Sequence, residues 1–98
     1  MTDTLFEWDD VKALSNLRKH GVDFDTATLV FYDPFAVTEM DRIEGGEQRW
    51  QTLGRVNDTL LLLVAHTVWD DDDTEIIRII SARQAVPKER RKYEQQNR

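Results

Sequence analysis

The sequence predicts a small α+β fold with a single β-sheet, on three observations. A short alternating segment precedes two helical segments with capping residues. The middle of the chain holds apolar or alternating segments separated by turn residues. A proline opens a polar, basic helical segment at the end. Together these patterns predict a first short strand, two helices, three or four further antiparallel strands and a C-terminal helix.

The first strand and helix are predicted by alternation followed by a cap. Residues 5–8 alternate apolar and polar, which places Phe6 and Trp8 on one face of a strand. Asp9 or Asp10 can cap the following helix, and Gly21 can end it in the left-handed conformation. We therefore expect a helix from about Asp10 to His20, whose apolar stripe is formed by Val11, Leu14 and Leu17.

A second, shorter helix begins after Asp23, a good N-cap residue. It should end at Asp33-Pro34, because a proline disfavours helical geometry in the residue before it. The chain should then be extended over residues 35–40, and residues 41–46 are interpreted as a connecting turn.

Three strands are expected in the second half of the chain. Residues 47–55 alternate, and Asn57-Asp58 is interpreted as a two-residue hairpin turn into a strand over 60–66. That strand is apolar on both faces, so it should be central, with helices covering one side. An isoleucine-rich strand over 75–82 should pair beside it across a loop formed by residues 70–73.

Composition and charge favour one domain over residues 1–98 in a reducing, cytoplasmic setting. The 98 residues include no cysteine and carry a formal net charge of −6. Positive charge is concentrated at the end: residues 81–98 hold six Lys and Arg against two Asp and Glu, whereas residues 1–80 hold seven against 17. No signal peptide is recognisable, and the apolar run 60–65 is too short to cross a membrane. The basic helix that begins at Pro87 is the place where a phosphate-bearing partner or an acidic protein could bind.

Long ordered strings in this sequence resemble a known family over roughly residues 5–94. The first half carries Phe6-Glu7-Trp8-Asp9, Lys12, Asn16, Lys19-His20-Gly21-Val22, Phe24, Val30-Phe31 and Asp33-Pro34. The second half carries Glu47, Arg49, Leu53-Gly54, Arg78-Ile79-Ile80-Ser81-Ala82-Arg83, Glu89 and Tyr93. These residues resemble the BrnT family of bacterial toxins.

The resemblance implies a RelE-like fold and a ribonuclease that halts translation. It also implies neutralisation by a BrnA-type antitoxin with a ribbon-helix-helix domain, through which contact with operator DNA would mainly occur. One position departs from the family: Val68-Trp69 stands where members commonly place an arginine. Trp69 could instead stack on an RNA base, a contact that contributes about 1–3 kcal/mol per base in single-strand binders.

Arg49, Arg78 and Arg83 are the candidates for stabilising charge during RNA cleavage. Each lies on or at the end of an expected strand, and a guanidinium group donates paired hydrogen bonds to phosphate. Strict alternation puts Arg78 and Arg83 on opposite faces of their strand. Either the strand ends or bulges near Ser81, or only one of the two arginines serves the site. The competing interpretation is that these arginines form ordinary ion pairs at a sheet edge.

His66 is a further catalytic candidate, because the ordinary pKa of histidine suits proton transfer near neutral pH. Lys12 and Lys19 share one face of the first helix with Asn16, opposite the apolar stripe, and are candidates for RNA binding, as is Tyr93 in the last helix. The alternatives are a structural histidine, a merely solvated helix face and a tyrosine ring packed on the sheet.

No metal or cofactor site is predicted. Residues 70–73 are acidic, but they lack the glycine and the distal glutamate of a calcium loop. Two functions therefore remain open: a metal-independent endoribonuclease toxin, and a noncatalytic scaffold of toxin origin that only binds an antitoxin.

Overall fold

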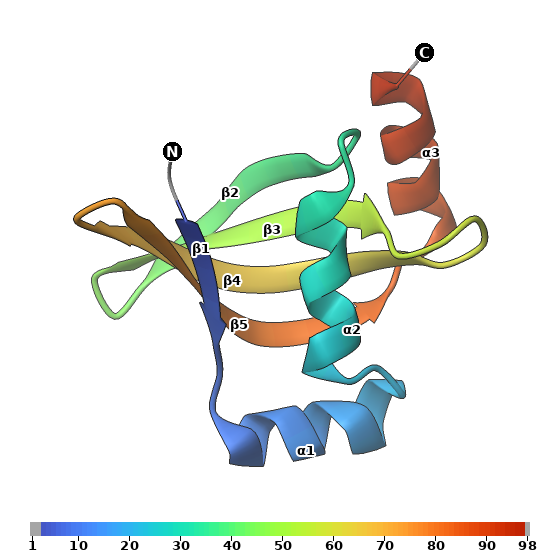
Figure 1. The fold of residues 1–98 in the computed structure, drawn as a ribbon. Helices are drawn as coiled ribbons and strands as arrows, with labels where there is room; N and C mark the ends of the chain where they lie inside the picture. Colours follow the sequence, from blue (N-terminus) through green and yellow to red (C-terminus); the bar gives the residue numbers. More distant parts are fainter. Residues whose placement is uncertain (1–2, 98) are drawn as a thin grey trace.

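The computed structural model describes residues 3–97 and consists of one five-stranded sheet with helices on both of its faces (Figure 1). The elements in chain order are β1 (Asp3–Glu7), α1 (Asp10–His20), α2 (Phe24–Thr28), the 3₁₀-helix η1 (Leu29–Tyr32), β2 (Val37–Glu44), β3 (Glu47–Arg55), β4 (Leu61–Asp71), β5 (Thr74–Gln84) and α3 (Pro87–Gln96). The predicted α+β class and the order of the elements are confirmed.

The sheet has the strand order β1-β5-β4-β3-β2. Strands β2 to β5 pair antiparallel, as predicted. However, β1 joins the far edge parallel to β5, with Phe6 opposite Ile77. The sheet is therefore mixed, because the β1–β5 pair is parallel and the other three pairs are antiparallel.

The helix boundaries follow the capping residues that the sequence provides. The Asp9 side chain accepts hydrogen bonds from the backbone N–H groups of Val11 and Lys12 at the start of α1. Gly21 ends α1 in the left-handed conformation, with φ = 72°. Asp23 caps α2 through the N–H of Thr26, as expected.

The turns between strands differ from the predicted ones. Strand β2 continues to Glu44, and Gly45-Gly46, both with positive φ, form the whole connection to β3. Likewise β4 continues to Asp71, and Asp72 supports the next turn with φ = 55°. Because both turns are tight, β2 extends into the predicted turn over 41–46 and β4 extends into the predicted loop over 70–73.

The connection between β3 and β4 is longer than the predicted two-residue turn and spans residues 56–60. Here the Asn57 side chain accepts hydrogen bonds from the backbone N–H groups of Thr59 and Leu60. Asn57 therefore stabilises a wider loop, because its side chain gives two backbone N–H groups a hydrogen-bond acceptor that a neighbouring strand would otherwise provide.

Helices cover both faces of the sheet, not one. On the α2 face, Phe24, Ala27 and Val30 pack against the even-numbered residues of β4. On the opposite face, which we call the α3 face, Tyr93 packs against Leu53 and Leu61. Because α3 covers only the end of the sheet near these residues, the rest of the α3 face is left without a covering helix (Figure 1).

Helix α1 is oriented opposite to the prediction. Its apolar stripe (Val11, Leu14 and Leu17) is exposed, whereas Asn16 is 6% exposed. The Asn16 amide donates to the carbonyl oxygen of Ala82 at 2.8 Å, and its oxygen accepts from the N–H of Ala82 at 3.1 Å. Strand β1 ends before it reaches Ala82, so the backbone N–H and C=O of Ala82 have no strand partner on that side. Asn16 supplies their hydrogen bonds, and this contact determines which side of α1 faces the sheet.

Candidate functional site

A β-bulge in β5 brings Arg78 and Arg83 to the same face of the sheet. Ala65 pairs with Ser81 and His66 pairs with Ile79, so Ile80 is an extra residue in β5. The buried residues of β5 accordingly change from odd to even numbers, and Ile77, Ile79 and Ala82 all belong to the core on the α2 face. Arg78 and Arg83 therefore both lie on the α3 face, which confirms the bulge near Ser81 that the sequence left as one of two possibilities.

Arg49 lies on this face as well, in line with Arg78. Trp50 pairs with His66, so the preceding residue, Arg49, stands beside Thr67, and Thr67 in turn pairs with Arg78. Arg49, Thr67 and Arg78 form a row across three neighbouring strands, which we call the arginine row. With strands about 4.8 Å apart, the Cα atoms of its two arginines are about 10 Å apart, a span that two guanidinium side chains can close on one ligand.

Two buried polar atoms in the arginine row have no hydrogen-bond partner. Within residues 3–97, the side-chain nitrogen and oxygen atoms left in this state are Nε of Arg49 and Oγ1 of Thr67. Thr67 is only 2% exposed, so its hydroxyl carries the full desolvation cost of an unpaired buried group. Unsatisfied buried groups are rare in folded proteins, and two at neighbouring positions call for an explanation such as strain, a bound water or a functional role.

Thr67 was not recognised from the sequence. Threonine is common in strands, and no pattern in the chain distinguishes it from its neighbours. Only the register of β4 and a complete account of buried hydrogen-bonding groups single it out.

Carboxylates lie near all three arginines, at different distances. Glu89 of α3 binds Arg83 through two hydrogen bonds of 2.8 Å, one to each carboxylate oxygen. The same contact lowers the pKa of Glu89 and raises the pKa of Arg83. In the arginine row, Glu7 lies 3.3 Å from Nη1 of Arg78, and Arg49 has only longer contacts, 3.7 Å to Glu47 and 3.9 Å to Glu44.

His66 is not brought together with the arginines. It lies on the α2 face, 3% exposed, with Nε2 at 2.8 Å from the hydroxyl of Thr52 and its ring edge-to-face with Phe31. Desolvation by burial lowers its pKa to about 4, which keeps the ring neutral at pH 7. This environment is that of a structural histidine.

Tyr93 faces the sheet rather than solvent. Its hydroxyl donates a 2.6 Å hydrogen bond to Oδ2 of Asp33, and the guanidinium carbon of Arg55 lies 5.3 Å from its ring centre. Burial, followed by the hydrogen bond to Asp33, raises the pKa of Tyr93. With 4% exposure, the ring anchors α3 to the sheet and has no free face on which a base could stack.

The other RNA-binding candidates are divided by the structure. Trp69 is 41% exposed and lies on β4 two residues beyond Thr67, so by strand alternation it extends from the α3 face at the open end of the sheet. Lys12 and Lys19 are exposed on α1, which packs at the β5 edge. The backbone N–H and the charge of Lys12, together with the charge of Arg78, lower the pKa of Asp9, so Lys12 and Arg78 both act on the same carboxylate.

Neither a metal centre nor a membrane helix is found among residues 3–97. No three His, Asp or Glu side chains in this part of the chain are grouped so that they could hold a metal ion. Its helices are also too short and too polar to cross a bilayer.

Comparison with known proteins agrees with the arrangement of these elements. A family model described as the ribonuclease toxin BrnT of a type II toxin-antitoxin system matches residues 8–89. The chain belongs to the BrnT family. Its membership makes it a toxin of a type II toxin-antitoxin system, a class of ribonuclease toxin that has an antitoxin partner.

A solved structure supports the fold. The chain is similar to the crystal structure of the ribonuclease toxin BrnT of Brucella abortus, with 22% sequence identity and a TM-score of 0.64. The similarity covers 87% of this chain and 99% of the Brucella protein. No curated protein sequence matches the chain.

Proposed function

We propose that this BrnT-family protein is an endoribonuclease that cleaves RNA on the α3 face, with the scissile phosphate bound at the arginine row. The observation that carries the proposal is the pair of buried, unsatisfied groups, Nε of Arg49 and Oγ1 of Thr67, at positions next to Arg78 in the strand register. Both groups can donate hydrogen bonds, and phosphate oxygens accept them. A bound phosphodiester would satisfy each of them once the side chains that cover them move aside.

The reaction that fits this arrangement is attack of the 2′-hydroxyl oxygen on the adjacent phosphorus, with release of its proton to water. The 5′-oxygen departs and takes up a proton from water, which leaves a 5′-hydroxyl and a 2′,3′-cyclic phosphate. Negative charge increases on the phosphorus-bound oxygens as the 2′-oxygen attacks. Fixed cationic donors placed where that charge develops lower the barrier most, because they need not reorganise. Arg49 and Arg78, which lie on either side of Thr67 on a rigid sheet, supply such donors, and we propose that no metal ion is required.

Arg83 is proposed as a third catalytic cation, and Glu89 as the residue that positions it. The two-fold contact to Glu89 fixes the plane of the Arg83 guanidinium at the boundary between β5 and α3. Glu89 is itself held, because its Oε1 accepts the backbone N–H of Val86 at the start of α3. Arg83 is therefore preorganised before RNA binds.

The wider biological role follows from the same site. We propose that RNA cleavage inhibits translation in the cytoplasm. A BrnA-type ribbon-helix-helix antitoxin neutralises the protein by covering the α3 face. Operator DNA is bound mainly through this antitoxin. Trp69 and Lys12, at the open end of the sheet and near Arg78 respectively, are proposed to contact RNA outside the arginine row. The overall charge of −6 argues against direct DNA binding.

Cleavage of naked RNA in excess chelator tests the proposal. The wild-type protein should cut the RNA, Arg83→Ala should lose most of the activity, and Arg18→Ala, an exposed position of α1, should retain it. Premixing with the antitoxin should block cleavage. Cleavage that chelator abolishes would contradict the metal-independent mechanism.

The alternative is a noncatalytic scaffold that only binds an antitoxin. It is favoured by the pairing of Arg78 and Arg83 with carboxylates, which also suits a purely structural role. A scaffold would bind the antitoxin with full affinity, would show no RNA cleavage in any condition, and would be unaffected by Arg83→Ala.

A further inference from the structure

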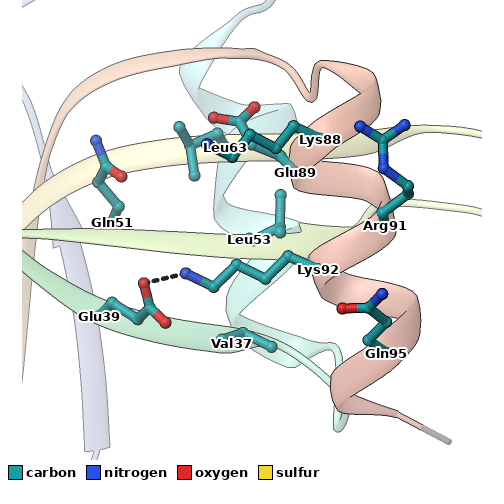
Figure 2. Close-up of a pocket in the computed structure, with 10 residues that line it drawn as sticks. All are labelled: Val37, Glu39, Gln51, Leu53, Leu63, Lys88, Glu89, Arg91, Lys92 and Gln95. Carbon is teal, nitrogen blue, oxygen red and sulfur yellow. Dashed lines mark hydrogen bonds and ion pairs between the residues drawn. The ribbon is translucent and has the colours of Figure 1, made fainter.

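A pocket opens between α3 and the sheet (Figure 2), and its lining includes none of the residues of the arginine row. Its volume is about 450 Å³, within the range of small-molecule sites. The floor is apolar and consists of Val37, Leu53 and Leu63, which come from three neighbouring strands. A floor of this kind, built across strands, offers a surface on which a planar ring can lie.

Polar groups surround this floor at opposite sides. Figure 2 shows the amide of Gln51 on the sheet side and the amide of Gln95 on the α3 side. An ion pair between Lys92 and Glu39 spans the pocket between α3 and β2. Amide groups both donate and accept hydrogen bonds, which is the capacity needed to read the edge of a nucleobase.

Two cations at the rim supply charge for a phosphate. Lys88 and Arg91 line the pocket from α3. The ion pairs within residues 3–97 engage Arg42, Arg49, Arg78, Arg83 and Lys92, and leave Lys88 and Arg91 unpaired. They are two of the six basic residues that the sequence concentrates in residues 81–98.

Glu89 connects the pocket to the proposed catalytic group. It lines the pocket and also holds Arg83 through two hydrogen bonds. A nucleotide in the pocket would therefore lie beside the Arg83 guanidinium, on the same face as the arginine row. The lining combines an apolar floor, amide groups and cations, which correspond to the ring, the edge and the phosphate of one nucleotide.

We infer that this pocket binds one nucleobase of the RNA substrate and determines which base stands next to the cleavage site, with Gln51 reading the base edge and Lys88 and Arg91 holding its phosphate. The inference rests on the proposed ribonuclease function and adds to it a site of base selection. It assigns selectivity to the pocket and bond cleavage to the arginines.

Binding of single nucleotides tests the pocket independently of cleavage. The four 3′-nucleoside monophosphates are titrated into the ¹³C-methyl-labelled protein, and the methyl resonances of Val37, Leu53 and Leu63 are followed by NMR. We expect these resonances to shift and one base to bind about tenfold more tightly than the weakest, as one or two net hydrogen bonds allow. Gln51→Ala should remove that preference, whereas Lys88→Ala should weaken all four nucleotides alike.

The matched control is Gln48→Ala, because Gln48 lies on the same strand but at an even-numbered position that faces away from the pocket. It should leave both binding and preference unchanged. The same variants are then compared on an RNA containing all four bases at equivalent positions. Gln51→Ala should still cut the RNA but with a flattened base preference.

The ribonuclease function and the base-selecting pocket are refuted by different results. Nucleotides that shift the floor methyls in a protein that cleaves no RNA would overturn the ribonuclease function and leave the pocket in place. RNA cleavage with no nucleotide binding at the floor, and with unchanged base preference in Gln51→Ala, would overturn the pocket alone. Shifts of the floor methyls by the antitoxin, but by no nucleotide, would identify the pocket as a protein-binding site and overturn the inference.

Discussion

Replacing Thr67 with valine should separate the effect on folding from the effect on catalysis. Valine has nearly the shape of threonine but lacks the hydroxyl. The Thr67 hydroxyl is buried and has no hydrogen-bond partner among the described residues. An unpaired buried polar group costs about 1–3 kcal/mol. Thr67→Val should therefore increase the free energy of unfolding by about 1 kcal/mol, which corresponds to a rise in Tm of about 4–8 °C for a domain of this size.

The same change should reduce activity if the hydroxyl binds the phosphate. A hydrogen bond to a charged group contributes about 1.5–3 kcal/mol, so kcat/KM should fall by about 10- to 100-fold. Stability is measured by urea unfolding and activity by cleavage of a short RNA under single-turnover conditions. A variant that is more stable but less active is the pattern expected of a strained functional position.

Thr52→Val is the matched control. Thr52 is also buried, on the neighbouring strand β3, but its hydroxyl bonds with Nε2 of His66 and with the Thr38 hydroxyl, each at 2.8 Å. Its loss should destabilise the fold by about 1–3 kcal/mol because a buried partner is left unpaired. If Thr67→Val destabilises the protein as Thr52→Val does, or keeps full activity, the argument from the unsatisfied hydroxyl is wrong.

Three further predictions concern stability. The pKa of His66 is lowered to about 4 in the fold, below its ordinary value of 6.5 in the unfolded chain. The neutral ring therefore imposes no cost on the free energy of unfolding above about pH 6.5. As the pH drops to 4, the unfolded chain takes up the proton first, and the free energy of unfolding falls by up to about 3 kcal/mol. Urea unfolding across this pH range should show a weaker pH dependence for His66→Gln than for the wild type. Tyr93→Phe removes the hydrogen bond to Asp33 and should cost about 1.5–3 kcal/mol by chemical denaturation, since the acceptor is charged. Gly54→Ala would place a Cβ atom 2.8 Å from Cβ and from the carbonyl oxygen of Val30 and should cost about 1–3 kcal/mol through overpacking, visible as a lowered Tm.

Much of the fold could be predicted because local signals agree with it. Asp9, Asp23 and Gly21 define the helix ends through contacts within a few residues, and the structure confirms each of them. The strand ends were less predictable. A turn of two residues at Gly45-Gly46 or at Asp72 looks in the sequence like part of a longer polar loop, and only pairing between the strands shows how far each one continues.

Long-range hydrogen bonding explains the errors in the first helix and the incomplete prediction of the site. The apolar stripe of α1 indicated the wrong buried side, because Asn16 satisfies the edge of β5 at Ala82, 66 residues away along the chain. Arg78 and Arg83 were recognised as candidates, but their common face depends on the bulge at Ile80. Thr67 carries no sequence signal and emerged only from the buried groups that the fold leaves unpaired.

A double-mutant cycle on Arg49 and Arg78 tests the central claim that the arginine row binds the scissile phosphate. Single-turnover RNA cleavage is measured for the wild type, Arg49→Ala, Arg78→Ala and the double variant. Each single change should slow cleavage by about 100-fold or more, as loss of a charge-stabilising donor does. The double variant should be much less impaired than the product of the two effects, because residues that act on one phosphate are coupled. Cleavage at close to the wild-type rate in either single variant, with the fold intact, would place the reaction elsewhere.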